Sequence, residues 1–445
     1  MKFLKIIGSS LVFVTLVSVS FAQEQVVPIT EQKAKYQSEC TFVIYIQADN
    51  NLDSYALYNI NDMQRALLPS SVNVLVQWDQ PNNKKTWRYH IVHNGRIEDA
   101  SLNVEMGLNP EQEIVDMMKW AKAGYSAKRW CVILWNHGAG IIDPRVAKIN
   151  RIINGQQIMP TKQTLPWLEI PGLSVFNPVG EDKERGILFD DSQNTYLSNT
   201  GLYNAFRRVK TEVLGKNIDI VGMDACLMAM LEVGYQIKDC VNILVGSEQT
   251  EPGEGWSYSG FLTAISNNPS MSATSLAAAI VSSYGDFYTS QTNDYTQSAL
   301  NLSKMVAIKN SVVKMITAVA ACRKADRVRT QQMVVAARRA SLSFDVSDYI
   351  DLYSFYNALV SQARSKKKSA KNSFVTAANV LIQELTAGML TIKSAVIANA
   401  IGSRDVKAKG ISIYYPTYGS VHSSYASTKF AQAVKSWSTF VKTYR

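Results

Sequence analysis

Short, continuous apolar runs recur along this chain and alternate with amphipathic helical patterns. The runs are rich in β-branched and aromatic residues and cover Thr41 to Ala48, Val72 to Trp78, Trp130 to Trp135, Ile218 to Met223 and Val241 to Val245. Runs without polar alternation are typical of strands that are buried on both faces of a parallel sheet. The alternation therefore predicts an α/β fold with helices on both faces of a mostly parallel sheet.

The segments between these runs carry helix signals. Pro110 follows Asn109, which places a proline at the first helical position after a capping residue. Further helices are expected at Tyr55 to Leu68, Leu202 to Leu214 and Ala229 to Lys238. The run Trp87 to Val92 ends at Asn94-Gly95, which predicts a hairpin strand appended to the sheet.

The first 22 residues resemble a targeting segment. Lys2 and Lys5 precede an apolar stretch, Ile6 to Val19, and Ser20-Phe21-Ala22 places small residues before a cleavage site. We expect a signal peptide that is cleaved after Ala22, so the protein is secreted or periplasmic. No later stretch approaches 18 uninterrupted apolar residues, which predicts no membrane span after signal removal.

The mature chain is expected to divide into an α/β core, residues 23–258, and a largely helical C-terminal region, residues 259–445. Long helical patterns such as Leu302 to Lys324 and Phe374 to Ala387 dominate that region, and a β-rich run returns at residues 410–416. Inside the core, residues 143–185 have weak periodicity and contain five of the twelve prolines. A loop of this length in a compact domain is usually functional or mobile.

Several function classes find no support in the composition. The formal charge is +10, but the densest basic run lacks interleaved aromatic residues and indicates a solvated helix end or loop, not a nucleic-acid surface. That run contains Arg364, Lys366, Lys367, Lys368 and Lys371. No H-E-x-x-H or C-x-x-C spacing occurs, so no zinc ligand set is visible. The five cysteines are too sparse for a disulfide framework, and the pairing of Cys40, Cys131, Cys240 and Cys322 stays open.

Two predicted strands deliver reactive side chains just beyond their ends. His137 lies in the glycine-rich turn after Trp135, and Cys226 follows the strand that ends at Met223. Open α/β sheets place their sites at this carboxyl edge. An imidazole can take the proton of a thiol and later donate it to a leaving amine, and the backbone N–H groups of Gly138 and Cys226 could bind the oxyanion. A lone cysteine after a strand is more often a buried small hydrophobe, but the combination favours a nucleophile–base pair.

At these residues the sequence resembles the clostripain family of cysteine peptidases, which are related to caspases, legumains and gingipains. The matching segments are Trp135 to Gly140, Asp224 to Met228, Gly246 to Trp256, Asp351 to Phe355 and Gly410 to Pro416. The resemblance implies a caspase-like three-layer α/β/α sandwich with an additional helical C-terminal region. It also implies a secreted endopeptidase that cleaves proteins or peptides after Arg or Lys, with His137 as general base and acid and Cys226 as nucleophile.

A pocket for a basic side chain needs buried anionic groups, because desolvating an unpaired cation is costly. Asp224, two residues before Cys226, is the first candidate, and Glu254 in the loop before Trp256 is the second. An alternative role for Asp224 is a favourable charge near a helix N-terminus. Asp351 is a more distant candidate, with a helix cap as its alternative.

The spacing between His137 and Cys226 is 89 residues, against about 50 in the caspase signature. The excess is close to the length of segment 143–185, which we interpret as an activation linker cut by the enzyme itself, a habit of the family. Candidate cleavage positions follow Arg145, Lys148 and Arg151. The product would be a monomer of two associated fragments. The alternative is a structured excursion that is never cut.

The predicted chemistry requires no cofactor, and calcium is possible because some members of the family depend on it. Asp190-Asp191 and the pair Asp182 and Glu184 offer oxygen ligands without EF-hand spacing. Two other hypotheses compete with the peptidase: a non-catalytic exported binding protein on a caspase-like scaffold, and a cysteine hydrolase acting on a non-peptide amide.

Overall fold

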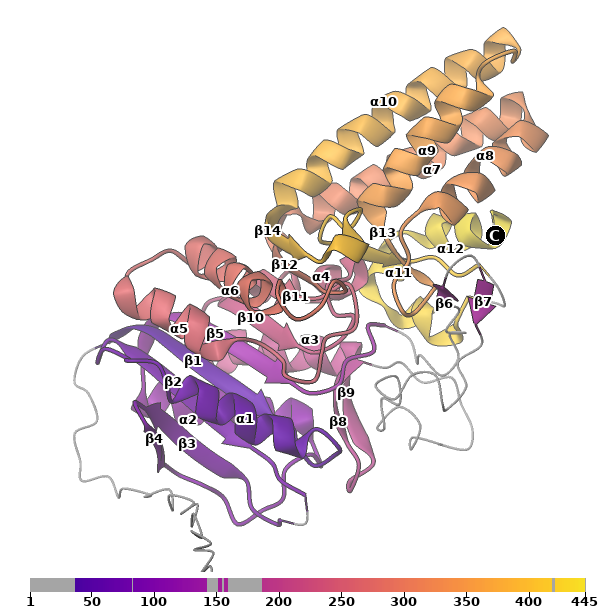
Figure 1. Ribbon diagram of the computed structural model, residues 1–445. Coiled ribbons are helices and arrows are strands. Elements are labelled where there is room, and N and C mark those ends of the chain that lie inside the picture. Colours follow the sequence, from indigo (N-terminus) through magenta and orange to yellow (C-terminus); the bar gives the residue numbers. More distant parts are fainter. Residues whose placement is uncertain are drawn as a thin grey trace, which may run out of the picture.

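A nine-stranded sheet runs through the centre of the protein (Figure 1). The structure is a computed structural model that describes residues 37–81, 83–141, 151–153, 156–158, 186–417 and 421–444. The strand order is β14-β12-β11-β10-β5-β1-β2-β3-β4. The strands are β1 (Ser38–Ile46), β2 (Val72–Trp78), β3 (Trp87–Val92), β4 (Gly95–Glu98), β5 (Ala127–Trp135), β10 (Ile218–Asp224), β11 (Val241–Gly246), β12 (Thr296–Asn301) and β14 (Val396–Ile401).

The five strands predicted from the apolar runs form the parallel centre of this sheet, in the order β2-β1-β5-β10-β11. The other four strands are antiparallel and lie at the two edges. The predicted hairpin is present as β3 and β4, with Asn94 in the left-handed conformation at its turn. The sequence-based fold class is therefore confirmed.

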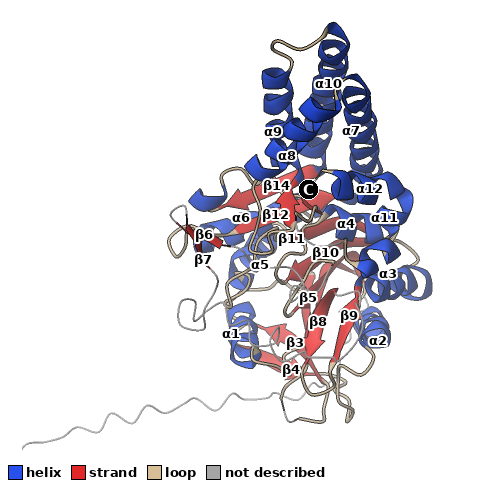
Figure 2. Ribbon diagram, turned by 90° about the vertical axis from the view of Figure 1, so that its right-hand side faces the viewer, coloured by secondary structure: helices blue, strands red, loops and turns tan. Residues whose placement is uncertain are grey.

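Helices cover both faces of the sheet, so that the core has three layers (Figure 2). Successive strand residues face opposite layers: Val43 and Tyr45 belong to one apolar cluster, and Phe42 and Ile44 belong to the other. One layer contains α2 (Pro110–Gly124), α3 (Asn199–Arg208) and α4 (Leu231–Ile237). The opposite layer contains α1 (Asp53–Met63), α5 (Tyr258–Asn267) and α6 (Ala273–Tyr288).

A bundle of four helices projects from one end of the sheet (Figure 1). Its members are α7 (Met305–Ala325), α8 (Arg327–Ala340), α9 (Leu352–Lys366) and α10 (Asn372–Ala395). In the part of the chain that the structure describes, two helices are long and apolar enough to cross a membrane by length and composition alone: α7 together with the 3₁₀ turn before it (Leu302–Ala325), and α10 (Asn372–Ala395). Core helices pass the same test, and the buried residues of α10 recur every three or four positions from Phe374 to Ala395, as on a helix with one packed face.

Shorter elements complete the described chain. The strands are β6 (Arg151–Ile153), β7 (Gln156–Ile158), β8 (Gly186–Asp190), β9 (Thr195–Ser198), β13 (Tyr349–Asp351) and β15 (Ser412–Tyr414). The helices are a π-helical turn (Val209–Leu214) after α3, three 3₁₀ turns (Leu302–Lys304, Ser403–Asp405 and Ser423–Ser427), α11 (Lys429–Ala433) and α12 (Lys435–Thr443).

The C-terminal region contributes more than helices. The central sheet continues across the expected division at residue 258, because β12 pairs with β11 and β14 pairs with β12. The late β-rich run forms β15, which pairs with β13 in a separate two-stranded sheet. All five cysteines are free thiols, and four of them are buried among apolar side chains: Cys40, Cys131, Cys240 and Cys322. The proposed signal peptide lies outside the described residues.

Candidate active site

Strand register brings His137 and Cys226 to the same edge of the sheet. In the parallel pair β5 and β10, Trp135 lies opposite Asp224. Each candidate catalytic residue follows its paired strand end by two positions, so both leave the sheet at the same level. The backbone N–H of Asn136 also donates to the carbonyl of Asp224 at 3.2 Å, which extends the pairing beyond the strand ends. The sequence-based expectation of a shared carboxyl edge holds in this geometry.

Gly138 allows the two turns to touch. A Cβ atom at this position would lie 2.3 Å from the carbonyl oxygen and 3.1 Å from the nitrogen of Cys226. Both atoms belong to the backbone, so no side chain could move aside to make room. The glycine is therefore required by close backbone approach and not by its dihedral angles, and it brings the main chain of residue 138 against that of residue 226.

The imidazole of His137 is buried and oriented by Asn51. Its Nε2 lies 2.9 Å from Oδ1 of Asn51, and because an amide oxygen can only accept, Nε2 carries the hydrogen and Nδ1 remains the basic nitrogen. Burial lowers the pKa of His137 to about 4, so the ring is neutral near pH 7. Asn51 lies 86 residues before His137, and the sequence offered no signal for it.

The thiol of Cys226 is half-buried and contacts the loop after β11. The backbone N–H of Glu251 donates to Sγ at 3.2 Å. Burial raises the pKa of Cys226 to about 12, with the carboxylates of Glu251 and Asp345 acting in the same direction. The next residue, Leu227, has a φ of 66°, and its N–H donates to the carbonyl of Gln249. A non-glycine residue in this conformation stores about 1–2 kcal/mol of strain beside the thiol.

A cavity of about 800 Å³ opens over these two residues. His137 and Cys226 both line it, together with Trp135, Tyr288 and Arg404. The carboxyl groups that line it are Asp224, Glu251, Glu254, Asp294 and Asp345. Arg404 pairs with Asp294 at 2.9 Å, which leaves the remaining wall of the cavity acidic. Such a cavity is complementary to a cationic ligand.

Asp224 lies at the end of β10 and is almost fully buried. Its carboxylate accepts hydrogen bonds from the hydroxyl of Tyr258 at 2.9 Å and from the backbone N–H of Trp256 at 3.3 Å. Burial raises the pKa of Asp224 to about 6, against the lowering effect of these donors. Since α4 starts only at Leu231 and Asp224 lines the cavity, the alternative of a helix-terminal charge does not describe its place.

Glu251 is a cavity residue that the sequence reasoning missed. It forms a tightly coupled pair with Asp224, and its Oε2 accepts from the indole N–H of Trp256 at 3.2 Å. Burial, and next the charge of Asp224, raises the pKa of Glu251 well above its usual range, so the pair holds a proton. Glu254 also lines the cavity, and its backbone carbonyl accepts from Asn59. Asp351 instead caps α9 through the N–H of Ser354 and does not line the cavity.

The described residues that flank segment 143–185 lie beside the turn that follows His137. Before the linker, the N–H of Ile141 donates to the hydroxyl of Tyr349, which itself donates to the carbonyl of Ala139 at 2.8 Å. After the linker, Gly138 forms an isolated bridge with Ile187 in β8. Two expected cleavage positions, Arg145 and Lys148, lie outside the described residues, and the third, Arg151, begins β6.

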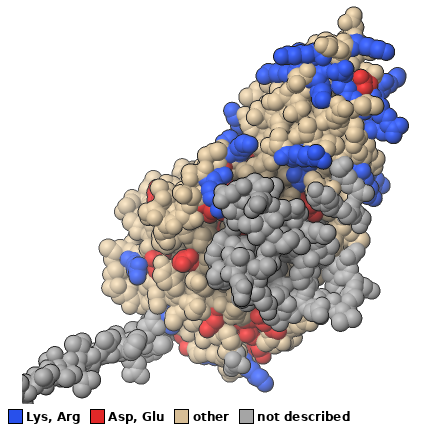
Figure 3. Space-filling view, turned by 45° about the vertical axis from the view of Figure 1, so that its right-hand side comes forward, with Lys and Arg blue, Asp and Glu red and all other residues tan. Residues whose placement is uncertain are grey.

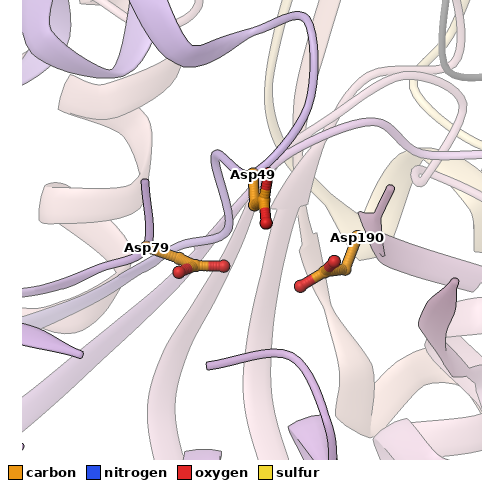
Figure 4. A group of neighbouring side chains, drawn as sticks. All are labelled: Asp49, Asp79 and Asp190. Atoms are coloured by element: carbon orange, nitrogen blue, oxygen red, sulfur yellow. The ribbon is translucent and has the colours of Figure 1, made fainter. Parts of the chain in front are cut away.

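Three buried aspartates converge at a second place on the same sheet edge (Figure 4). Asp49 and Asp79 follow β1 and β2, and Asp190 ends β8; oxygen atoms from all three lie within 4.8 Å of one another. The amide of Gln47 donates to Asp79 and Asp190, whereas Oδ2 of Asp49 has no hydrogen-bond partner. Three buried carboxylates with one spare oxygen could bind a cation such as calcium. Asp190 was expected as a ligand, Asp182 and Glu184 lie outside the described residues, and Asp49 and Asp79 were missed.

Comparisons with known proteins agree with this architecture. The chain is 18% identical to a secreted C11 cysteine protease from Bacteroides thetaiotaomicron, solved with an irreversible peptide inhibitor, with a TM-score of 0.57 over 89% of this chain and 99% of that one. It is 16% identical to an inactive zymogen C11 protease from Parabacteroides distasonis, with a TM-score of 0.54 over 90% and 99% of the two chains.

Sequence comparisons reach the same group of proteins. Clostripain from Hathewaya histolytica is 21% identical over 264 residues, which are 53% of this chain, and the chain spans only 44% of that relative's length. The profile of the clostripain family, peptidase family C11, matches residues 44–160 and 176–443, which is most of the sequence. With the sheet, the helical extension and these matches in place, the chain belongs to the clostripain family of cysteine peptidases.

Proposed function

We propose that this chain is a secreted endopeptidase that cleaves after Arg or Lys, with Cys226 as nucleophile and His137 as general base and acid. The observation that supports it best is that both residues line one acidic cavity from equivalent positions beyond β5 and β10. The related protein from Bacteroides thetaiotaomicron is described as secreted, in agreement with the signal peptide expected here.

The reaction starts from a neutral pair. Because the pKa of the Cys226 thiol is raised and that of His137 is lowered, the proton stays on sulfur until substrate binds. Sγ then attacks the scissile carbonyl carbon while Nδ1 of His137 takes the thiol proton. The negative charge that develops on the carbonyl oxygen is stabilised by the backbone N–H groups of Gly138 and Cys226.

Collapse of this intermediate breaks the C–N bond, and the imidazolium of His137 donates its proton to the leaving amine. A water molecule then attacks the thioester, again with His137 as base, and releases the carboxylic acid and the free thiol. Asn51 acts as a positioning residue, because its hydrogen bond to Nε2 selects the tautomer that leaves Nδ1 basic.

Specificity for basic residues follows from the acidic wall of the cavity. A guanidinium or ammonium group that enters it would face Asp224, at the end of β10, and Glu251 and Glu254, on the loop after β11. The coupled pair of Asp224 and Glu251 holds a proton in the empty pocket, and a bound cation favours its release. The positive charge of the substrate side chain thereby takes the place of the shared proton, which otherwise offsets the repulsion between the Asp224 and Glu251 carboxylates.

We infer that segment 143–185 is an activation linker cut by the enzyme itself after Arg145, Lys148 or Arg151. On one side of the segment Tyr349 links Ile141 to Ala139, and on the other side Ile187 pairs with Gly138, so the described flanking residues lie close to the proposed catalytic pair. The zymogen character of the relative from Parabacteroides distasonis agrees with this proposal. After cleavage the two fragments stay together as one monomer, because β5 and β10 pair in the same buried sheet.

Calcium is proposed as a structural ion held by Asp49, Asp79 and Asp190. Burial raises the pKa of Asp79 to about 9 in the absence of a cation, with neighbouring Asp190 and Asp49 adding to the effect. A bound divalent cation would offset the repulsion of the three carboxylates and supply charge compensation without taking part in the chemistry.

One experiment tests the function and separates its competitors. Peptide amides that differ only in Arg, Lys, Gln or Asp before the scissile bond are incubated with wild-type protein, Cys226→Ala and His137→Ala. We expect cleavage after Arg and Lys by wild type, none by Cys226→Ala and a large loss for His137→Ala, because either change removes the covalent route. Full activity of Cys226→Ala would refute the mechanism. A folded wild-type protein without any turnover would favour a binding protein on the same scaffold.

A further inference from the structure

The far end of the helical bundle concentrates positive charge. Helices α7 and α9 end there, and α8 and α10 begin there. A hydrogen bond from Nη1 of Arg329 to the carbonyl of Lys366 joins the start of α8 to the end of α9. Figure 3 shows Lys and Arg gathered over this end of the molecule, whereas acidic side chains gather toward the opposite end. We call the following residues the basic tip: Arg323, Lys324, Arg327, Arg329, Arg364, Lys366, Lys367, Lys368 and Lys371.

Almost none of this charge is neutralised within the protein. Asp326, the acidic residue between α7 and α8, pairs with Arg329 at 3.3 Å. In the part of the chain that the structure describes, no ion pair involves any of the other eight cations. Lys366 and Lys367 donate to the neutral amides of Gln332 and Asn379 instead. The basic tip is therefore a local excess of positive charge at the end of a packed helical bundle.

Helix stability does not account for this arrangement. Cations in the last turns of α7 and α9 are favourable, because the C-terminal ends of helices carry partial negative charge. Arg327 and Lys371 lie at the first position of α8 and at the N-cap of α10, where the macrodipole opposes them. Lys371 also makes no side-chain capping hydrogen bond. These cations reduce the stability of the bundle, which points to a role in binding.

The chemistry of the basic tip fits an anionic lipid surface better than a nucleic acid. Among residues 321–330 and 361–374 the single aromatic side chain is Phe374, which is buried, so no ring is available for base stacking. Val328 is 67% exposed between two arginines and can enter the headgroup region. Clusters of four to eight Lys or Arg are typical of surfaces that bind anionic phospholipids.

We propose that the basic tip docks this protein onto an anionic phospholipid surface. The bundle projects the tip away from the catalytic sheet, and α10 alone has 24 residues, a length of about 36 Å. Binding through the tip therefore leaves the acidic cavity over His137 and Cys226 open. It also separates the acidic cavity from the negative membrane, so that the two anionic surfaces do not repel each other at close range.

Vesicle co-sedimentation tests this proposal with the full mature chain. We expect binding to phosphatidylcholine vesicles only when phosphatidylglycerol is included, and weaker binding as salt is raised. The tip variant carries Lys324→Gln, Arg327→Gln, Arg364→Gln and Lys368→Gln, four exposed cations whose side chains make no hydrogen bond or ion pair with any residue that the structure describes. A matched control variant carries Lys84→Gln, Lys304→Gln, Lys407→Gln and Lys435→Gln, which are also exposed and lie outside the basic tip.

Each Lys or Arg near an anionic leaflet strengthens binding about fivefold. The tip variant should therefore lose about two to three orders of magnitude in affinity for the vesicles. The control variant has the same net charge as the tip variant, but its affinity should stay closer to that of wild type. Thermal unfolding of both variants checks that they fold. Equal loss in both variants, salt-independent binding by wild type, or binding to an acidic polysaccharide but not to vesicles would each overturn the proposal.

Discussion

Replacing Gly138 by alanine tests how the proposed catalytic residues His137 and Cys226 are brought together. The new Cβ would lie 2.3 Å from the carbonyl oxygen of Cys226, about 1 Å closer than ordinary contact. Because both partners are main chain, the two turns must separate by a comparable distance. A misplacement of about 1 Å in a catalytic group costs about 100-fold in rate, or about 2.7 kcal/mol of transition-state stabilisation.

The expected cost to folding is smaller. Overpacking at one position typically destabilises a protein by about 1–3 kcal/mol, and the turn lies at the edge of the sheet, so Gly138→Ala should unfold only a few degrees below wild type. The matched control is Gly124→Ala at the end of α2, where a Cβ would meet nothing within 4 Å and φ is not left-handed. This variant should keep wild-type activity and stability.

The assay is kcat/KM on a peptide amide with Arg before the scissile bond, measured alongside thermal unfolding. A loss of about 100-fold for Gly138→Ala with a folded protein, and no change for Gly124→Ala, would support the close-approach argument. If Gly138→Ala kept activity within about threefold of wild type, the contact between the two turns would not control the geometry of the dyad, and the reasoning would fail.

Three further outcomes are expected. The carboxyl of Asp224 becomes protonated as pH falls below its pKa of about 6, so KM of the wild type for an Arg substrate should rise between pH 7 and pH 5. Asp224→Asn should lose about 2–5 kcal/mol of binding free energy for the Arg substrate at pH 7. A KM–pH profile of this variant should then show little further pH dependence. Wild-type protein should convert to two associated fragments, and replacing Arg145, Lys148 and Arg151 together by Gln should leave one chain with lower activity; mass spectrometry of a fully active, uncut wild type would contradict this. Chelation should lower the unfolding temperature of wild type and calcium should restore it, whereas Asp49→Asn should be insensitive to both; an equal response of the two proteins would exclude this site.

Local patterns in the sequence were sufficient for the centre of the fold. Five buried runs became five parallel strands, since only a doubly covered sheet can bury continuous apolar segments of this kind. The Asn109 cap and Pro110 at the start of α2 likewise lie where expected, because capping depends on neighbours within one turn. The same reasoning placed His137 and Cys226 at one edge, since parallel strands that share a register end at the same edge.

The edge strands depended on tertiary pairing. The sequences of β12 and β14, TQSALN and VIANAI, contain small and polar residues and lack a strong strand signal. They become strands because β11 offers β12 an unpaired edge, and β12 in turn offers one to β14. The late strand β15 was expected from its β-rich composition. Its partner β13 was not expected, because it becomes a strand only by pairing with β15 in the folded chain.

The supporting residues of the site were also decided by the tertiary structure. Asn51 reaches His137 across 86 residues, and Gln47 reaches Asp190 across 143. Contacts over such separations leave no periodicity in the sequence, because they depend on how loops from different strands meet above the sheet. The chain by itself identified the two groups that we propose as base and nucleophile. The packing of its loops decided the tautomer of His137, the acidic wall of the cavity around Cys226 and the convergence of Asp49, Asp79 and Asp190 at the same edge of the sheet.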